Sequence, residues 1–576
     1  MVTEHVKILL PSSSVPPNVQ QIVGIRSSHS SDVEEFRGIP YGIVTERWES
    51  PKLADHLPCD SFDGSRHGPK CPQPAEPNNT EIFQSHLDYS SEVAESELDC
   101  LNLFIARPSA AALHQAGSTG EDGLPVMVWI HGGGYGYGAG SDPPWDPSRV
   151  ILQSVKVGKP FIAVYINYRL NLFGFGASSE LLETQSDSSF KGCNFGLQDQ
   201  HVALQWVSKN ISAFGGDPNR ITIAGQSAGG ISVHAQVLEA KSNPRKPLFQ
   251  RAIVQSGAMG TVGPISAEEA DSRWMYLCQH LHITHKSEKE RVDFLRKMPA
   301  SDMVRIAGEI KWFSFPLVAE NKTVTMLPDG GVKVVLEPRS DAVNQGMEDE
   351  PIKVLIGDCD GEGMIWLDSI SKIRSYDEIR SVIEHAYTSK SLVEAVLEAY
   401  HITAQSQTEE LHRCLLQFMT DAKFGLPVHS AIRSLASHNR IAGEIATEVQ
   451  AYRIKYTNPF SGILSTLAHH CVDLLYIFDA FYEDLAKAEP SSEALVEAMQ
   501  QHWIDFIWDG CQPETSNYGV SEDDITVYER DRTRTVRKLN EDPECIERAK
   551  RLGLLAQDPA GMRTLWGMLS GVIPRS

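Results

Sequence analysis

The segment over residues 225–230, GQSAGG, constrains the fold more than any other part of this sequence. A run with strand character, residues 220–224, precedes it, and a run with helical character, residues 231–238, follows it. A G-x-S-x-G motif between a strand and a helix predicts a turn too tight for side chains on either side of the serine. Such a turn lifts the serine hydroxyl above the sheet, which makes Ser227 the candidate nucleophile.

A second glycine cluster, HGGG at residues 131–134, lies upstream of this motif. It ends an apolar run, residues 126–130, that predicts a buried parallel strand. Backbone N–H groups of such a loop can stabilise an oxyanion, because no side chain blocks the approach. We predict that Gly133, Gly134 and Ala228, the residue after the candidate nucleophile, donate these N–H groups.

Several further segments occur in the order found in type-B carboxylesterases, the family that also contains cholinesterases and some fungal lipases. They are FRGIPY at 36–41, ELDCLNL at 97–103, NYRL at 167–170, NFGLQDQ at 194–200 and FGGDP at 214–218. The sequence therefore resembles this family, most closely its intracellular fungal-type members. The resemblance extends from about Phe36 to Trp503 and is densest before Ser256.

This resemblance implies an α/β-hydrolase fold. Such a fold has a large mixed, mostly parallel sheet flanked by helices, with helical insertions over the active site. We expect a single domain over residues 1–576, with an N-terminal extension over residues 1–20. The helical pattern over about 367–460 predicts a lid or gorge wall.

The fold orders its triad as serine, acid and histidine, so the acid is expected after Ser227 in the sequence. By resemblance, the acid belongs to a G-x-x-x-x-E-G segment, and residues 357–363 place Glu362 at that position. Asp358 and Asp360 are alternatives within the same segment. The sequence departs from the family here, with Gly361 where Asp is common.

Two adjacent histidines, His469 and His470, are candidates for the base. The family pattern H-x-x-D-L-x-Y-x-F fits when it starts at His470, and a start at His469 breaks the spacing. We expect His470 to take the proton of Ser227 and later to give it to the leaving alcohol. Ser256 matches a family serine behind the triad and is expected to support it, although an ordinary serine at a strand end fits equally well.

Composition narrows the partners of the chain. The formal net charge of −23 argues against nucleic acids and anionic membranes as main partners. No stretch approaches the roughly 20 apolar residues of a membrane span. We expect a small-molecule ester as substrate, with no cofactor and no metal, and the sequence leaves open whether the chain is a monomer or a homodimer.

The cysteines and the N-terminus bear on the compartment. By resemblance, Cys71 and Cys100 match the two halves of a disulfide found in secreted relatives. Ten cysteines and a first segment without the pattern of a signal peptide favour a reduced chain in the cytoplasm. The alternative is a secreted protein whose leader was removed, in which case Cys71 and Cys100 are expected to be bridged.

The expected reaction is hydrolysis of an apolar or aromatic ester or lactone through an acyl-enzyme on Ser227. Choline esters fit poorly, because no Trp lies between Cys71 and Cys100 and Gln226 stands where cholinesterases carry Glu. Residues 312–316, WFSFP, are candidates for the wall of an acyl pocket, with core packing as the alternative.

Three other functions are weighed against this one. Transfer of the acyl group to an alcohol, in the tailoring of a specialised metabolite, is a close variant of the same chemistry. A non-catalytic cholinesterase-like binding protein is disfavoured by the intact Ser227, Glu362, His470 and HGGG segment. A lipase is disfavoured because residues 71–100, the usual lid position, are polar and acidic.

Overall fold

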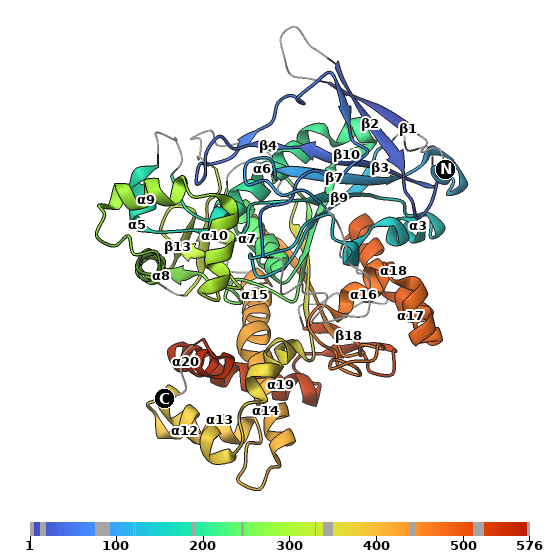
Figure 1. The fold of residues 1–576 in the computed structure, drawn as a ribbon. Helices are drawn as coiled ribbons and strands as arrows, with labels where there is room; N and C mark the ends of the chain where they lie inside the picture. The colour runs from blue at the N-terminus through green and yellow to red at the C-terminus, as the bar shows by residue number, and fades with distance from the viewer. Residues whose placement is uncertain are drawn as a thin grey trace.

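A single mixed sheet forms the frame of the molecule. The computed structural model describes residues 5–11, 19–74, 93–118, 120, 122–185, 191–243, 247–328, 330–337, 350–436, 445–510 and 523–572. Its main sheet has 13 strands in the order β1-β2-β3-β7-β9-β8-β10-β11-β16-β17-β18-β19, with β6 paired to β2 (Figure 1).

The centre of this sheet is parallel, and its outer parts are largely antiparallel. The central strands are β9 (Ile162–Ile166), β8 (Leu124–Ile130), β10 (Gly216–Gln226), β11 (Arg251–Gln255), β16 (Ile352–Cys359), β17 (Thr447–Ile454) and β18 (Asp524–Tyr528). The outer strands are β1 (His5–Pro11), β2 (Val19–Arg26), β3 (Val33–Pro40), β6 (Ser61–Asp63), β7 (Asn102–Pro108) and β19 (Arg534–Lys538). This is the predicted mixed, mostly parallel sheet.

The central strands β8 and β9 are apolar because both faces of the sheet are covered. Every residue of β8 and β9 is buried. Val126 and Val128 of β8 belong to one core cluster, whereas Met127 and Trp129 belong to another. Since side chains alternate along a strand, the two clusters lie on opposite faces. Helices α6 (Phe195–Asn210) and α7 (Ala228–Ser242) contribute to the first cluster, and α3 (Ser148–Lys156) and α18 (Glu493–Asp509) to the second.

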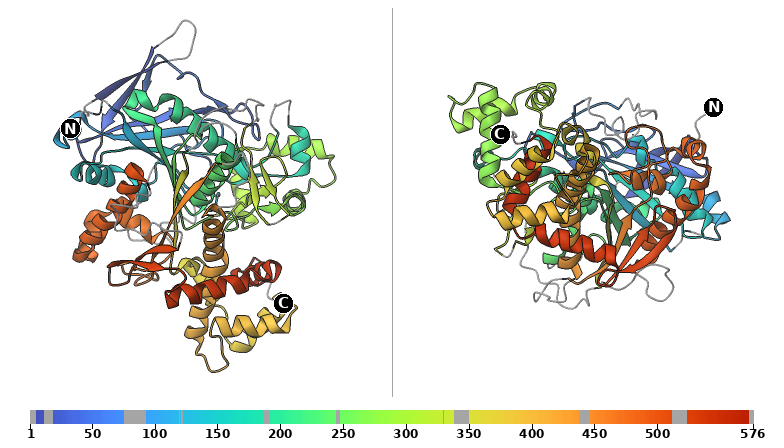
Figure 2. Two further views of the ribbon diagram at one scale, coloured as in Figure 1. Left: turned by 180° about the vertical axis from the view of Figure 1, so that it is seen from behind. Right: turned by 90° about the horizontal axis from the view of Figure 1, so that it is seen from below.

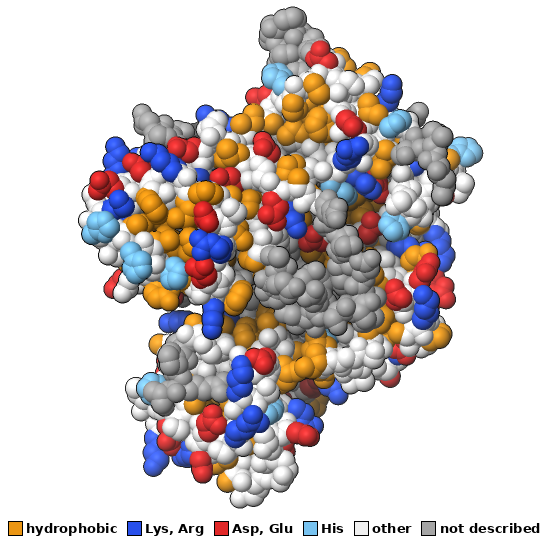
Figure 3. Space-filling view, viewed as in Figure 1, with side chains coloured by type: hydrophobic (Ala, Val, Ile, Leu, Met, Phe, Trp, Pro, Cys, Tyr) orange, Lys and Arg blue, Asp and Glu red, His pale blue; other side chains and the backbone are white. Residues whose placement is uncertain are grey.

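A helical body projects from one end of this sheet (Figures 1 and 2). It consists of α11 (Leu367–Ile370), α12 (Tyr376–Ala386), α13 (Lys390–Ala399), α14 (Thr408–Thr420), a π-helical turn (Asp421–Gly425), α15 (Leu426–Ala436), α19 (Pro543–Leu555) and α20 (Pro559–Ser570). Apart from α15, these helices share a core of their own, separate from the two clusters on the sheet. The buried residues Val428, Ala431 and Leu435 of α15 belong to the first cluster on the sheet. In the space-filling view a notch above α20 separates this body from the rest of the molecule (Figure 3).

The structure corrects two of the predicted boundaries. The helical segment ends at Ala436 in the described part of the chain, and β17, which the prediction of 367–460 included, is a strand buried in the sheet. The predicted extension over residues 1–20 also contains β1, which pairs antiparallel with β2 and buries Ile8 and Leu10. The rest of that extension, apart from the first two residues of β2, lies outside the described residues.

Candidate active site

The turn between β10 and α7 carries Ser227 in a backbone conformation that is rare for residues with a side chain, with φ 59° and ψ −123°. The neighbouring glycines are required by space. A Cβ on Gly225 would lie 2.6 Å from the backbone of Gly229, and a Cβ on Gly229 would lie 1.9 Å from the carbonyl oxygen of Ile130. The turn between strand and helix therefore leaves no room for a side chain at position 225 or 229, as the motif predicts. Ser227 itself is partly exposed.

The glycine loop after β8 lies directly beside this turn. A Cβ on Gly132 would lie 3.0 Å from the Cβ of Ser227. Gly133 and Gly134 both have positive φ, 108° and 59°, and a Cβ on Gly133 would lie 2.1 Å from the carbonyl oxygen of Tyr137. Ala228 is the first residue of α7, where a backbone N–H has no acceptor within the helix. The three predicted oxyanion donors thus come from two segments that meet next to Ser227.

Glu362 and His470 are brought together from two separate loops. Glu362 begins the turn of 3₁₀ helix after β16, and His470 precedes α16 (Val472–Phe478). Nδ1 of His470 lies 2.5 Å from Oε2 of Glu362, and both side chains are buried. The backbone N–H of Cys359 donates to the other carboxylate oxygen at 2.7 Å. Each oxygen of Glu362 therefore has a partner, and the carboxylate is fixed against the imidazole ring.

The surroundings of His470 make it a strong base. Burial by itself lowers the pKa of His470, whereas the neighbouring Cys471 and Glu362 side chains raise it, and the net pKa lies well above the ordinary 6.5. The side-chain amide nitrogen of Gln226 lies 3.2 Å from Nε2 of the ring. Because an amide nitrogen only donates, Nε2 accepts this bond, and the ring proton lies on Nδ1 toward Glu362. This is the tautomer that a general base needs.

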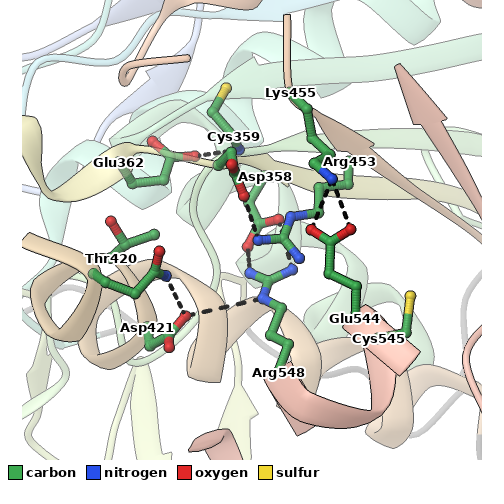
Figure 4. Close-up of polar contacts among 12 residues, drawn as sticks. Asp358, Cys359, Glu362, Thr420, Asp421, Arg453, Lys455, Glu544, Cys545 and Arg548 are labelled. Carbon is green, nitrogen blue, oxygen red and sulfur yellow. Dashed lines mark hydrogen bonds and ion pairs between the residues drawn. The ribbon is translucent and has the colours of Figure 1, made fainter. Parts of the chain in front are cut away.

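The two alternative carboxylates bind arginines instead of the histidine. Asp358 pairs with Arg548 of α19 through both of its oxygens (Figure 4). Asp360 pairs with Arg453 of β17 at 2.5 Å and with Arg530 at 3.2 Å. Of the three acidic residues in the segment, Glu362 is the one that contacts His470.

The alternative histidine is directed elsewhere. Nε2 of His469 lies 2.9 Å from the side-chain nitrogen of Asn458, and Nδ1 lies 2.5 Å from the backbone oxygen of His470. Burial lowers the pKa of His469 to about 4, so the ring is neutral at ordinary pH. His469 is thus a buried histidine with local partners, as the motif spacing predicts.

Ser256 lies behind the acid, with a positive φ of 49°. Its Oγ lies 3.7 Å from Sγ of Cys359, the residue whose N–H binds Glu362. The serine therefore reaches the triad through one intermediate residue, which fits the supporting role expected from the sequence.

Two residues of the site escaped the sequence analysis. Gln226 was considered only as a departure from cholinesterases, yet its amide contacts the ring of His470. Phe424, in the π-helical turn, packs against the same ring at 4.8 Å between centroids. The position next to Ser227 was a signal for the first residue. The second had no signal, because a π-helical turn has no sequence pattern in the period of a regular helix.

Cys71 and Cys100 are both buried and free in the structure, in contrast to the bridged alternative. The backbone N–H of Leu170 donates to Sγ of Cys71 at 3.2 Å. The neighbouring Cys71 side chain and burial raise the pKa of the Cys100 thiol well above its ordinary value. The two thiols are therefore adjacent, and the thiol of Cys100 stays protonated.

A small cavity of about 30 Å³ lies next to the segment 312–316, and none of its lining residues belongs to the glycine loop. Its wall includes Trp312, Phe315 and Pro316 of the predicted acyl-pocket segment, together with Phe175 and Trp274. The N–H of Phe315 donates to the backbone oxygen of Gly134 at 2.9 Å, so the wall is hydrogen-bonded to the loop. Phe313 of the same segment is exposed instead. Within the described residues, no helix is both long and apolar enough to cross a membrane.

Comparisons with known proteins give one consistent result. A family model described as "Carboxylesterase family" matches residues 12–550. Para-nitrobenzyl esterase of Bacillus subtilis (strain 168) is 30% identical over 524 residues, which cover 87% of this chain and 94% of that protein. A solved structure of a PNB esterase aligns with a TM-score of 0.67 and 26% identity, over 95% of this chain and 99% of its own.

A further relative carries a different description. "Inactive carboxylesterase-like protein VdtD" of Byssochlamys spectabilis is 29% identical over 509 residues, which cover 82% of this chain and 80% of that protein. Likeness along the chain therefore does not by itself establish turnover, and the residues at the site have to carry that argument.

Proposed function

Since this chain belongs to the carboxylesterase family and is a carboxylic ester hydrolase, we propose that it works through an acyl-enzyme on Ser227. The observation that carries this proposal is the contact of 2.5 Å between Glu362 and His470, next to a serine held in the strained turn after β10. The intact set of three residues favours a working enzyme over a non-catalytic binding protein.

In the proposed reaction, Oγ of Ser227 attacks the ester carbonyl carbon while Nε2 of His470 takes the hydroxyl proton. The serine hydroxyl then occupies the place at Nε2 that the amide of Gln226 holds in the structure. Glu362 stabilises the imidazolium, and the N–H groups of Gly133, Gly134 and Ala228 stabilise the negative carbonyl oxygen.

Collapse of the tetrahedral intermediate completes the first half. The bond to the alcohol breaks as His470 returns its proton to the leaving oxygen, and the acyl group stays on Ser227. Water then attacks the acyl carbon with His470 again as base, which releases the acid and restores the serine. An alcohol in place of water gives the transesterification variant by the same steps.

We propose apolar or aromatic esters or lactones as substrates. Support comes from the apolar side chains of Trp312, Phe315 and Trp274 around a small cavity, and from the bond of 2.9 Å that joins Phe315 to Gly134 of the predicted oxyanion loop. Apolar walls bind an uncharged acyl chain by removing its surface from water.

Hydrolysis of a p-nitrophenyl ester series from acetate to decanoate, with wild type and Ser227→Ala, tests the mechanism. We expect turnover in the wild type, loss of turnover in the variant, and a chain-length optimum that reflects the acyl pocket. Ser272→Ala is the matched control, because Ser272 is an exposed serine of α8 (Ala267–His280).

Covalent labelling by an organophosphate distinguishes an enzyme that does not turn over these esters from a protein without a reactive serine. Labelling at Ser227 without turnover of these esters means that the triad works and that the natural substrate or acceptor is specialised. Neither labelling nor turnover in the folded wild type would overturn the proposed mechanism.

A further inference from the structure

A buried cluster outside the active site brings a histidine and two glutamates together from three segments. His201 lies on α6, Glu239 on α7, and Glu337 follows β15 (Val332–Val334). One nitrogen or oxygen from each of the three side chains lies within 4.8 Å of the others, and all three residues line a cavity of about 150 Å³. We propose that this cluster binds a divalent transition-metal ion, with Zn²⁺ as the best match.

The orientation of His201 supports a metal ligand. Nδ1 of the ring lies 3.1 Å from Oε1 of Gln236, and Nε2 of Gln236 donates to the backbone oxygen of Leu197 at 3.2 Å. The second bond fixes the amide so that its oxygen faces the ring, which places the imidazole proton on Nδ1. A metal-binding histidine typically donates its other N–H to such an acceptor.

Nε2 of His201 is then left with a lone pair directed into the cluster. The residue is 4% exposed, and Nε2 has no hydrogen-bond partner among the described residues. Oε2 of Glu337 is 3.8 Å away, beyond hydrogen-bonding distance. A buried nitrogen acceptor without a donor is costly, and a cation between Nε2 and the carboxylates would satisfy it.

Neutral amides hold the two carboxylates in place. The side-chain nitrogen of Asn243 donates to Glu239 at 2.7 Å and to Glu337 at 3.2 Å. Gln205 donates to the second oxygen of Glu337 at 3.0 Å. These bonds orient the carboxylates, as is typical around metal ligands.

One imidazole nitrogen and two carboxylate oxygens form a donor set that suits Zn²⁺ better than Mg²⁺ or Ca²⁺, which prefer oxygen alone. The cavity has room for a water molecule as fourth ligand. No ligand-spacing motif announces the site, because the three residues are far apart in the sequence, which explains why the sequence predicts no metal.

Isothermal titration of the full chain with Zn²⁺, after removal of metals by a chelator, tests the proposal. We expect binding of one ion per chain, and binding at least roughly 100-fold weaker in His201→Gln and in Glu337→Gln. The second variant alters a half-buried residue and keeps the test valid if the first fails to fold. His280→Gln is the matched control, since it removes an exposed histidine that lies 3.1 Å from Glu309.

Binding of Co²⁺ gives a second readout that is independent of esterase activity. Absorption bands of bound Co²⁺ in the visible range would report the geometry around the ion.

Two positively charged residues, Arg245 and Lys246, follow Asn243 closely in the sequence and lie outside the described residues. The variant R245Q/K246Q is included for this reason. Wild type that binds no more Zn²⁺ than His201→Gln would overturn the proposal. So would binding that arises only in R245Q/K246Q, because the native chain would then balance the glutamates by itself.

Discussion

The contact between Glu362 and His470 controls the pH range in which the proposed base works. His470 has to be neutral to take the proton of Ser227, so activity rises as the pH increases through its pKa. Glu362 stabilises the charged ring and thereby contributes to the raised pKa of His470. A change in the charge around this ring should therefore move the acid limb of the pH profile in a direction that can be stated in advance.

Glu362→Gln removes one negative charge from the ring. We expect the acid limb of kcat/KM to move to lower pH, because the imidazolium loses its partner. We also expect kcat to fall by about 10⁴-fold, as when a triad acid is replaced by its amide. A pH profile of p-nitrophenyl ester hydrolysis measures both effects, and an unmoved acid limb would contradict the assigned partner.

Gln226→Glu should move the same limb in the opposite direction. The amide of Gln226 lies 3.2 Å from Nε2 of His470, so a carboxylate in its place adds negative charge beside the ring. We expect a further rise in the pKa of His470 and a larger loss of activity at pH 6 than at pH 8. A shift to lower pH would show that the two side chains are not in contact in solution.

At the scale of secondary-structure elements, buried ion pairs attach the helical body to the sheet beside Glu362 (Figure 4). Arg548 of α19 contacts Asp358 at the end of β16 and lies 4.0 Å from Asp421 at the start of the π-helical turn. Arg551 binds Asp421 at 2.7 Å. The same turn carries Phe424, which packs against the ring of His470, so this packing depends on the ion pairs.

Arg548→Met tests the network. Removal of the guanidinium leaves Asp358 buried without its partner, and we expect a loss of about 3–5 kcal/mol in the free energy of unfolding. Arg530→Met is the control, because Arg530 is an exposed arginine paired with Asp360, and it should cost no more than about 1 kcal/mol. Urea denaturation of both variants measures the difference, and equal effects would show that the pair with Asp358 is not buried in solution.

These elements also show where sequence reasoning ends. The strand before Ser227 and the acid segment after β16 could be predicted from local patterns, because apolar runs and glycines indicate the backbone conformation of their own segment. The π-helical turn at Asp421–Gly425 and the attachment of α19 do not, since they depend on charges that are distant in the sequence. The strand β17 was not predicted because its strand character depends on pairing with β16 and β18, which lie elsewhere in the chain.

For the molecule as a whole, the helical body has a core that is separate from the cores on the sheet. Elements with separate cores can open independently, with a lower free energy than global unfolding. The mostly parallel sheet with helices on both faces was predicted, because its motifs are local and ordered. The inclusion of the C-terminal helices in the helical body was not predicted, since no motif links them to residues 367–436.

Leu415→Ala tests this independence. Leu415 is buried in the core of the helical body, and its truncation should cost about 2–5 kcal/mol locally. We expect faster hydrogen exchange in residues 367–425 and 559–570, with exchange in β8 and β10 unchanged. Val128→Ala, in the core on the sheet, is the matched control and should speed exchange throughout. A uniform effect of Leu415→Ala would mean that the molecule unfolds as one unit.

The participation of α19 and α20 in the helical body has a consequence for folding during synthesis of the chain. A nascent chain leaves the ribosome from its N-terminus, so Ser227 and the strands from β1 to β17 can form before these two helices are released. Until then the helices α11 to α14 lack apolar partners such as Leu565 and Leu569, and Asp358 and Asp421 lack their arginines. The proposed catalytic acid Glu362 and base His470 would thus receive their final support only at the end of translation, which would keep an unfinished chain from acting as an esterase.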